Sequence, residues 1–498
     1  MSSSNEGRVV TICRLFSTLV IPDTLFRDLD LAGARPCSLL LQRAIRHQQN
    51  NEWECCQEVA FKAREFSWEQ LHSGPSWQAV AQVHRDAYGA AGLFLAAAVF
   101  LSDEAGSLER ALYILDLVTL MAGGRFQEAA NLFIESIEAH AKLKVPSAAS
   151  NDVESTSRAA DVKGQPLKKA RRDRPDILGP EHTLGKDSTE GVRRVPLPSL
   201  EVFQMEFMET ATPVILTGAM EGWPALGKHG QESRDWSNPS YLRTVAGRRT
   251  VPVELGGSYT GEGWRQELMT IADFIGRFIE AEEDARDEAV GDAGANQGDT
   301  TKRSQEVAEE SSAKTLGCRR RTPSPHRGTV RGVTKEKAYL AQHQLFEQIP
   351  SLRKDIMTPD YCSLLLSDEE DDPNAASVAT NAWFGPAGTV SPLHNDPFHN
   401  LLAQVVGSKR VLMVNRKLSA AVYPRPGLMS NTSQVDAANP DLLIHPKFAD
   451  AMPLLECELN KGEILYIPPL FWHHIESRSV SFSVSFWWGR RRTLSEGY

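Results

Sequence analysis

The sequence lacks the features that mark disulfide-rich, zinc-ribbon or secreted proteins. Its seven cysteines are odd in number and scattered, and no two of them are separated by two residues. Neither a disulfide framework nor a cysteine-rich zinc site is therefore indicated. The first residues carry no basic stretch followed by an apolar one, so we expect no secretory signal. Any metal should then be held by histidine and carboxylate side chains.

Long apolar runs and an excess of basic charge are also missing. The longest apolar run, residues 92–101, is about half as long as a membrane span, so we expect no membrane association. The 54 basic residues are outnumbered by 64 acidic ones, and the net charge is -10. Direct binding to nucleic acid is not expected of such a chain. The length of 498 residues, at 41% hydrophobic, predicts two or three globular domains inside the cell.

The first 145 residues are predicted to form a helical interaction domain. Apolar residues recur at three- and four-residue spacing in residues 108–121 and 125–140. Ser67, with Gln70 three residues later, is expected to cap the N-terminus of a helix. Paired amphipathic helices often dock a partner protein, but they also form bundles without any site. The pattern leaves both alternatives open.

Two segments have the composition of disordered chain. Residues 146–192 are rich in serine and charge, and predict a linker. Within it, the basic cluster at residues 168–172 suits nuclear import or a nucleic-acid contact. We therefore expect the protein in the nucleus, or in both nucleus and cytoplasm. Residues 281–335 begin acidic and end basic, which predicts a solvated insertion inside the second domain.

The rest of the chain, residues 193–498, has the pattern of a β domain. Short β-branched runs end close to glycine, and residues 479–486 alternate between apolar side chains and serine. Residues 401–406 and 409–414 are predicted to be two strands joined by a tight turn at Gly407 and Ser408. Many short strands without intervening helices predict an antiparallel barrel or jelly roll. The whole chain is therefore expected to be α+β.

His394, Asp396 and His473 are the candidate metal ligands. Two imidazoles and one carboxylate leave three positions of a metal open, as a non-haem Fe(II) oxygenase requires. Histidine followed two residues later by an acid is a weak pattern, expected about 1.7 times by chance in this composition. Two other matches begin at His84 and His474. Only the match at His394 lies in the β region with another strand-flanking histidine well downstream.

Longer motifs around these residues resemble the JmjC family of oxygenases. Residues 381–386 read Asn-Ala-Trp-Phe-Gly-Pro, residues 391–397 Ser-Pro-Leu-His-Asn-Asp-Pro, and residues 462–468 Gly-Glu-Ile-Leu-Tyr-Ile-Pro. Phe-Ser-Val-Ser-Phe-Trp-Trp follows at residues 482–488. The resemblance implies a C-terminal double-stranded β-helix of the jelly-roll or cupin type. It also implies Fe(II) on His394, Asp396 and His473, 2-oxoglutarate as cosubstrate, and O₂.

The resemblance further implies which residues bind the organic molecules. Lys409 matches the lysine that pairs with the distal carboxylate of 2-oxoglutarate, as suits a compact ammonium. Four other positions match the lining of the cosubstrate pocket: Tyr339, Ser391, Asn400 and Trp487. Glu254 and Trp383 match positions that enclose a target arginine, by hydrogen bonds to a carboxylate and by an aromatic face.

Three neighbours of the ligands depart from the family pattern. Asn395, Phe398 and His399 stand where the resemblance leads to glutamine, which leaves the ligands intact but means that the resemblance does not fix the fine substrate preference. His399 and His474 do not match ligand positions, and are expected behind the ligands or in solvent.

The function implied first is hydroxylation of an arginine side chain in a protein, since Glu254 suits a hydrogen-bonding guanidinium. Demethylation of a methylated lysine, such as one on a histone tail, uses the same iron site and is the alternative. A barrel that serves only as a binding scaffold is a third hypothesis, disfavoured by the intact ligand set.

Overall fold

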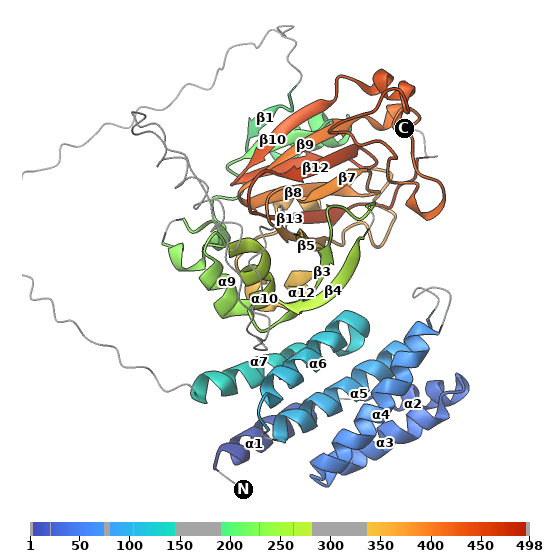
Figure 1. The fold of residues 1–498 in the computed structure, drawn as a ribbon, viewed down its shortest axis with the longest axis vertical. Coiled ribbons are helices and arrows are strands. Elements are labelled where there is room, and N and C mark those ends of the chain that lie inside the picture. The colour runs from blue at the N-terminus through green and yellow to red at the C-terminus, as the bar shows by residue number, and fades with distance from the viewer. Residues whose placement is uncertain are drawn as a thin grey trace, which may run out of the picture. The chain divides into compact units, whose positions relative to one another are not determined.

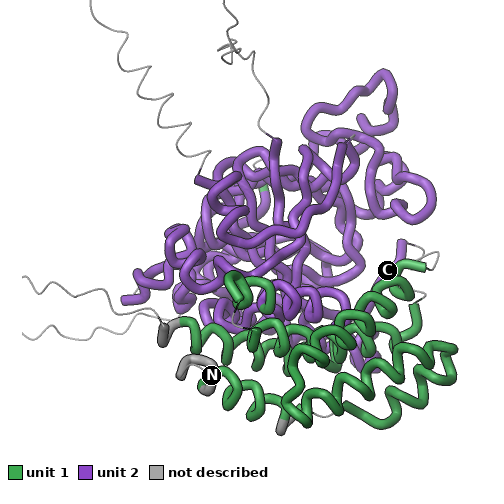
Figure 2. The backbone as a smooth tube through the Cα atoms, turned by 60° about the horizontal axis from the view of Figure 1, so that its bottom comes forward, with its two compact units in different colours: residues 1–111, 124–191 green, residues 112–123, 192–498 purple. Residues whose placement is uncertain are grey.

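The computed structural model describes residues 3–19, 21–73, 80–102, 104–144, 191–228, 230–261, 263–280 and 336–494. The predicted insertion and most of the predicted linker, with its basic cluster, lie outside these residues. The chain divides into two compact units, residues 1–111 with 124–191 and residues 112–123 with 192–498 (Figure 2). The first is helical and the second is built around two β-sheets, so the α+β prediction is confirmed.

The N-terminal unit is built from helices (Figure 1). Its helices are α1 (Ser3–Thr18), α2 (Asp23–Leu31), α3 (Arg35–Gln49), α4 (Trp53–His72), α5 (Gln82–Leu101) and α7 (Gln127–Lys144), with only the first turn of α6 (Ser107–Met121). Helix α5 is apolar on every side, and all of its residues from Asp86 to Leu101 are buried. A helix of that composition belongs inside a bundle, where α3 and α4 cover it.

The predicted helix start at Ser67 is wrong. Ser67 lies within α4, fully buried, and its hydroxyl donates a hydrogen bond to the carbonyl of Ala63 at 2.9 Å. The helix continues across Ser67 instead of starting there, because Val59, Ala63 and Leu71 form a buried face at helical spacing with Ser67. Burial of that face outweighs the local capping pattern.

Part of α6 groups with the C-terminal unit, namely residues 112–123. Within that unit the buried carboxylate of Asp116 accepts hydrogen bonds from the Arg249 guanidinium at 2.7 and 2.9 Å. It also accepts one from the backbone N–H of Thr250 at 2.7 Å, and one from the Gln348 amide at 2.8 Å. Thr250 begins β3, the strand that carries Glu254, so this network fixes one end of that strand.

The C-terminal unit contains a nine-stranded and a four-stranded sheet. The larger has the order β1-β2-β11-β8-β13-β6-β5-β3-β4, and the smaller β10-β9-β12-β7. The strands are β1 (Arg194–Pro196), β2 (Val214–Thr217), β3 (Thr250–Leu255), β4 (Arg265–Thr270), β5 (Ala338–His343), β6 (Ala379–Gly385), β7 (Val390–His394), β8 (His399–Val406), β9 (Ser408–Val414), β10 (Leu455–Asn460), β11 (Glu463–Ile467), β12 (Trp472–Ser477) and β13 (Ser481–Trp488). Apart from β1 with β2, the paired strands run antiparallel, as in a jelly roll.

Two layers of the core flank the large sheet. Between the sheets, Leu402 and Leu465 of the large sheet pack with Val411 and Met413 of the small one. The other face of the large sheet packs against aromatic residues such as Trp223 and Trp236. Short helices accompany that face: α8 (Leu200–Phe203), α9 (Pro239–Ala246), α10 (Ile271–Phe274), α12 (Leu345–Gln348) and α13 (Pro350–Arg353).

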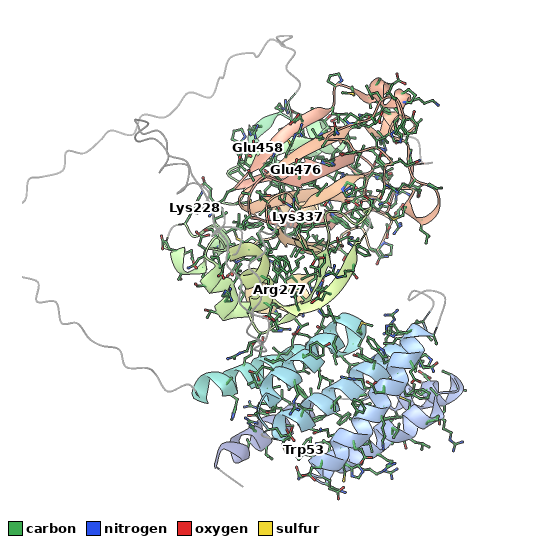
Figure 3. The ribbon with its side chains drawn as sticks, viewed as in Figure 1. Trp53, Lys228, Arg277, Lys337, Glu458 and Glu476 are labelled. Atoms are coloured by element: carbon green, nitrogen blue, oxygen red, sulfur yellow. The ribbon has the colours of Figure 1, made fainter. Side chains whose placement is uncertain are left out.

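Charged residues occupy one end of the outer face of the small sheet, whereas Leu412, Val414 and Trp472 at the other end are buried in an apolar cluster. Figure 3 labels Glu458 of β10 and Glu476 of β12, which both pair in register with Arg410 of β9. Alternate residues of β10, such as Cys457 and Leu459, are buried on the opposite side. This alternation leaves the inner face of the small sheet for the core and the site.

The predicted tight turn at Gly407 does not join paired strands. β8 pairs with β11 and β13, whereas β9 pairs with β10 and β12. The chain therefore passes from one sheet to the other at Gly407, which has a φ of 70°. A Cβ at this position would lie 2.0 Å from the carbonyl oxygen of Val480, so both the conformation and the space require glycine.

None of the described helices is long and apolar enough to cross a membrane.

Substitution of Gly407 by alanine should destabilise the C-terminal unit by at least about 3 kcal/mol, because left-handed strain and overpacking add. Gly462→Ala is the matched control, since Gly462 has a φ of 89° and no atom within 4 Å of its Cβ position. It should cost only the strain, about 1 kcal/mol. Thermal and urea unfolding measure both, and equal losses would contradict the steric account.

Candidate metal centre and cosubstrate pocket

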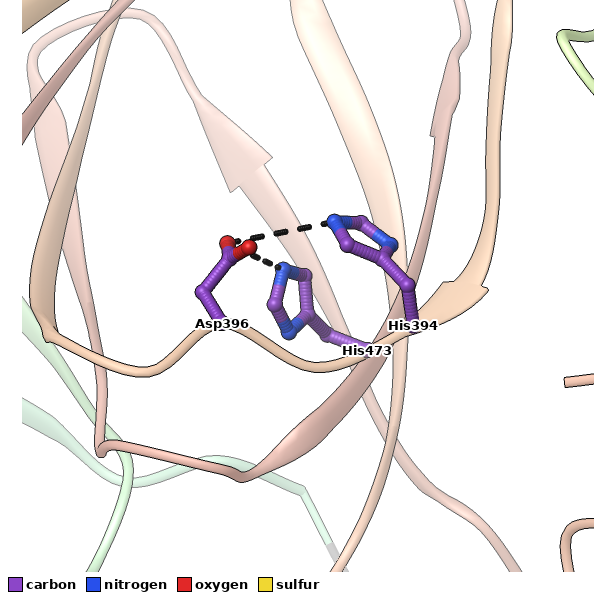
Figure 4. A group of neighbouring side chains, drawn as sticks. All are labelled: His394, Asp396 and His473. Carbon is purple, nitrogen blue, oxygen red and sulfur yellow. Dashed lines mark ion pairs between the residues drawn. The ribbon is translucent and has the colours of Figure 1, made fainter. Parts of the chain in front are cut away.

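The three predicted metal ligands meet at one end of the small sheet. His394 ends β7, and His473 faces it in register from β12, with ring centroids 4.2 Å apart. Asp396 lies in the loop after β7, and its carbonyl accepts a hydrogen bond from the N–H of Leu470, just before β12. The Asp396 carboxylate is 3.5 Å from His473 Nε2 and 3.9 Å from His394 Nε2 (Figure 4). One ligand atom from each residue lies within 4.8 Å of the others.

Backbone carbonyls orient both imidazoles. His394 Nδ1 is 2.7 Å from the carbonyl oxygen of Pro392, and His473 Nδ1 is 2.9 Å from that of Phe471. A carbonyl only accepts, so each Nδ1 carries the hydrogen and each Nε2 lone pair is directed toward Asp396. Burial, together with the neighbouring His473, lowers the pKa of His394 to about 4, which keeps its imidazole neutral. Imidazoles with free Nε2 lone pairs beside a carboxylate fit Fe(II).

Lys409 provides a buried positive charge nearby. The residue is 1% exposed, and its ammonium donates a hydrogen bond to the Tyr339 hydroxyl at 2.9 Å. Among the described residues it forms no salt bridge, and burial lowers its pKa to about 7. A buried ammonium without a carboxylate is costly unless a ligand supplies one. The distal carboxylate of 2-oxoglutarate is a group that would fit.

The other predicted cosubstrate residues surround the same space. Tyr339, Ser391 and Trp487 line a pocket of about 570 Å³, together with His394 and Asp396. Asn400 pairs in register with Trp487 on the adjacent strand. Within the described part of the chain, Asn400 Oδ1 and Trp487 Nε1 are buried without a hydrogen-bond partner. Unsatisfied polar atoms around a cavity are typical of a ligand site.

Glu254 and Trp383, the predicted substrate residues, line this pocket as well. Glu254 accepts a hydrogen bond from Trp264 Nε1 at 3.2 Å. Burial raises the pKa of the Glu254 carboxyl, although the bond from Trp264 opposes that shift. Trp383 donates its own N–H to the Ser485 hydroxyl at 2.9 Å, which fixes the indole. A cation bound among these rings would stabilise the charged form of Glu254.

His399 and His474 do not join the metal ligands. His399 is fully buried, with Nδ1 2.8 Å from the Tyr466 hydroxyl and Nε2 3.3 Å from Glu369. His474 is 3% exposed. This placement fits the prediction that neither histidine is a ligand. The alternative that they face solvent is wrong, because both are buried. His84, the other weak match, lies on α5 in the helical unit.

Sequence reasoning missed several pocket residues, among them Tyr259, Trp264, Met429 and Arg491. Trp264 could have been found from the hairpin of β3 and β4, because Leu255 pairs with Arg265 next to it. Arg491 follows the last strand, and no local pattern indicates that the chain there returns to the pocket.

A jelly roll that brings two histidines and an aspartate together is typical of non-haem Fe(II) oxygenases. Comparison with known proteins extends this result. Residues 199–493 match the model of the cupin-like domain, and residues 51–151 match that of KDM8-like N-terminal ARM repeats.

Similar proteins come from animals and plants. Lysine-specific demethylase 8 of Danio rerio is 35% identical, over 94% of this chain and 97% of that protein. Lysine-specific demethylase JMJ30 of Arabidopsis thaliana is 35% identical, over 88% of this chain and 87% of the relative. Jumonji C domain-containing protein 5 of Drosophila melanogaster is 36% identical over 60% of this chain and 59% of that protein. The chain belongs to the KDM8-like JmjC oxygenases, a family of Fe(II)/2-oxoglutarate-dependent enzymes within the cupin fold.

The pKa of Lys409 predicts how cosubstrate affinity depends on pH. Without a ligand the ammonium is charged below about pH 7 and loses its proton above it. A carboxylate binds the charged form, so binding above pH 7 must take up a proton. Affinity for 2-oxoglutarate should then fall about tenfold per pH unit above 7. Calorimetry on Mn(II)-loaded protein in two buffers measures both affinity and proton uptake.

Lys409→Arg is the control, because a guanidinium keeps its proton throughout this range. If this variant binds 2-oxoglutarate, its affinity should not follow that pH dependence. Affinity of the unaltered protein that stays constant up to about pH 9 would contradict the role of Lys409.

Proposed function

We propose that this chain uses Fe(II), 2-oxoglutarate and O₂ to oxidise a cationic side chain of a protein substrate. The observation that carries the proposal is the position of Glu254. Its carboxylate lines the same pocket as His394 and Asp396, among the aromatic rings of Trp264 and Trp383. A carboxylate and aromatic faces together bind organic cations.

Each part of the pocket has a role in this proposal. His394, Asp396 and His473 would hold Fe(II), which with 2-oxoglutarate and O₂ supplies the oxidation of a C–H bond. Lys409 and the Tyr339 hydroxyl would bind the distal carboxylate of 2-oxoglutarate. Ser391, Asn400 and Trp487 would complete the cosubstrate pocket. Glu254 would hold the cation so that one carbon beside its nitrogen lies next to the metal.

A methylated lysine is the target that the relatives support, because the proteins from Danio rerio and Arabidopsis thaliana are named lysine-specific demethylases. Mono- and dimethyl-lysine keep an N–H for Glu254, and a histone tail is a candidate substrate. Arginine is the second candidate, favoured by Glu254 itself, since a guanidinium can donate several hydrogen bonds to one carboxylate. Hydroxylation would then replace demethylation with the same iron site.

The N-terminal unit and the basic cluster support the cellular part of the proposal. Residues 51–151 match ARM repeats, and stacked helical repeats commonly bind proteins, so we propose a protein partner for this unit. The basic cluster at residues 168–172 supports a nuclear location. A role as a scaffold alone is disfavoured, because that role would not require two histidines and an aspartate brought together beside a buried lysine.

Product analysis separates the two candidate reactions. The full-length protein, loaded with Fe(II) and 2-oxoglutarate without oxygen, is exposed to O₂ with matched peptides containing dimethyl-lysine or arginine. Loss of one methyl group supports the demethylase, and gain of one oxygen supports the hydroxylase. Glu254→Gln should raise the KM for the active peptide by about 10- to 100-fold, the loss of one charge-assisted hydrogen bond. Mass spectrometry and rate measurements give both results.

Asp396→Ala is the control, because it removes one proposed iron ligand and should abolish turnover while the fold remains. Unchanged turnover in this variant would contradict the assignment of Asp396 as an iron ligand. If neither peptide changes and no succinate forms, the enzymatic proposal fails.

A further inference from the structure

The segment that follows the last strand forms part of the wall of the pocket. After β13, the N–H of Gly489 donates to the carbonyl oxygen of Ala375 at 2.9 Å. Three residues on, the N–H of Arg492 donates to the carbonyl oxygen of Pro397 at 3.0 Å. Pro397 directly follows Asp396, so this segment is attached to the loop that carries a proposed metal ligand.

Two acidic residues hold the segment in place. The Arg492 guanidinium is almost wholly buried, and donates to Asp368 at 2.8 and 2.9 Å and to Glu369 at 3.0 Å. The backbone N–H of Arg490 donates to Glu369 at 3.2 Å. Burial alone would raise the pKa of Glu369, but His399 and Arg492 lower it to about 2, so this carboxylate stays charged. The backbone of Arg490 and the side chain of Arg492 thus both bind the carboxylate of Glu369.

Arg491, between these two residues, has a different environment. Its side chain lines the pocket that contains Glu254 and Asp396, and the residue is exposed. No salt bridge to Arg491 is found among the described residues. A guanidinium held at the mouth of a substrate pocket can bind a carboxylate through two parallel hydrogen bonds.

We propose that Arg491 is a specificity-determining residue that binds an aspartate or glutamate of the protein substrate, close to the target side chain. The inference rests on the proposed function. Glu254 receives the cation that reacts, and Arg491 receives an acidic neighbour, so the pocket selects a cationic residue beside an acidic one. The cosubstrate is not the expected partner of Arg491, because the buried Lys409 ammonium is available for its distal carboxylate.

Three fluorescent peptides test the proposal. They share a central arginine or dimethyl-lysine, whichever reacts, and carry glutamate, serine or lysine at the flanking positions. Their binding to the full-length protein with Mn(II) and 2-oxoglutarate, which does not turn over, is measured by fluorescence anisotropy. Arg491→Glu should weaken binding of the glutamate peptide by about tenfold and strengthen binding of the lysine peptide, as charge reversal at an interface rim does.

Lys417→Glu is the matched control. Lys417 is also exposed and forms no salt bridge among the described residues, but it does not line the pocket. This variant has the same change in net charge, so an equal effect on the peptides would assign the result to general electrostatics and overturn the proposal. Thermal unfolding verifies that both variants are folded.

Three further results would also overturn the inference. Arg491→Glu could leave the relative affinities of the glutamate, serine and lysine peptides as they are in the unaltered protein. If the peptides still bind and react in that case, only the role of Arg491 fails. If that variant instead raises the KM for 2-oxoglutarate and leaves peptide preference unchanged, Arg491 belongs to the cosubstrate site. Failure of every peptide to bind or react with the unaltered protein would overturn the proposed function, and this inference with it.

Discussion

The pairing of His394 on β7 with His473 on β12 is the constraint on which the site depends. Strand register sets the two rings 4.2 Å apart, and backbone carbonyls direct both Nε2 atoms toward Asp396. A shift of either strand by one residue would turn its histidine to the other face of the sheet. The chain passes between the sheets at Gly407 into β9, which pairs with the strand that carries His473. The inward face of the small sheet is thereby left for the site.

The pocket concentrates charge that the protein alone does not neutralise. The ammonium of Lys409 is buried beside a tyrosine hydroxyl, and Glu254 is a carboxyl whose pKa burial raises. Both groups cost stability until a ligand of opposite charge arrives. A dicarboxylate at Lys409 and a cation at Glu254 would each recover that cost, so the pocket suits two ligands of different charge. Affinity for them is thus obtained at the expense of fold stability.

The sequence singled out the three candidate metal ligands that the structure brings together and several residues that line the pocket, but not the complete lining. His394, Asp396 and His473 could be chosen because their motif lies in the β region, and Lys409 and Tyr339 because of the resemblance to a family. The predicted turn at Gly407 indicated the right strands and the wrong pairing, since a turn signal does not specify the partner sheet. Ser67 misled because burial of α4 outweighed a local pattern. Arg491 was not foreseeable, because its place depends on tertiary contacts of its neighbours with Asp368 and Glu369.

A crystal structure with Mn(II) and 2-oxoglutarate bound would show whether these residues form the metal and cosubstrate site. We expect one metal ion coordinated by His394, Asp396 and His473, with the distal carboxylate of 2-oxoglutarate against Lys409 and Tyr339. A metal ion held elsewhere, or a cosubstrate whose distal carboxylate does not contact Lys409, would contradict this expectation.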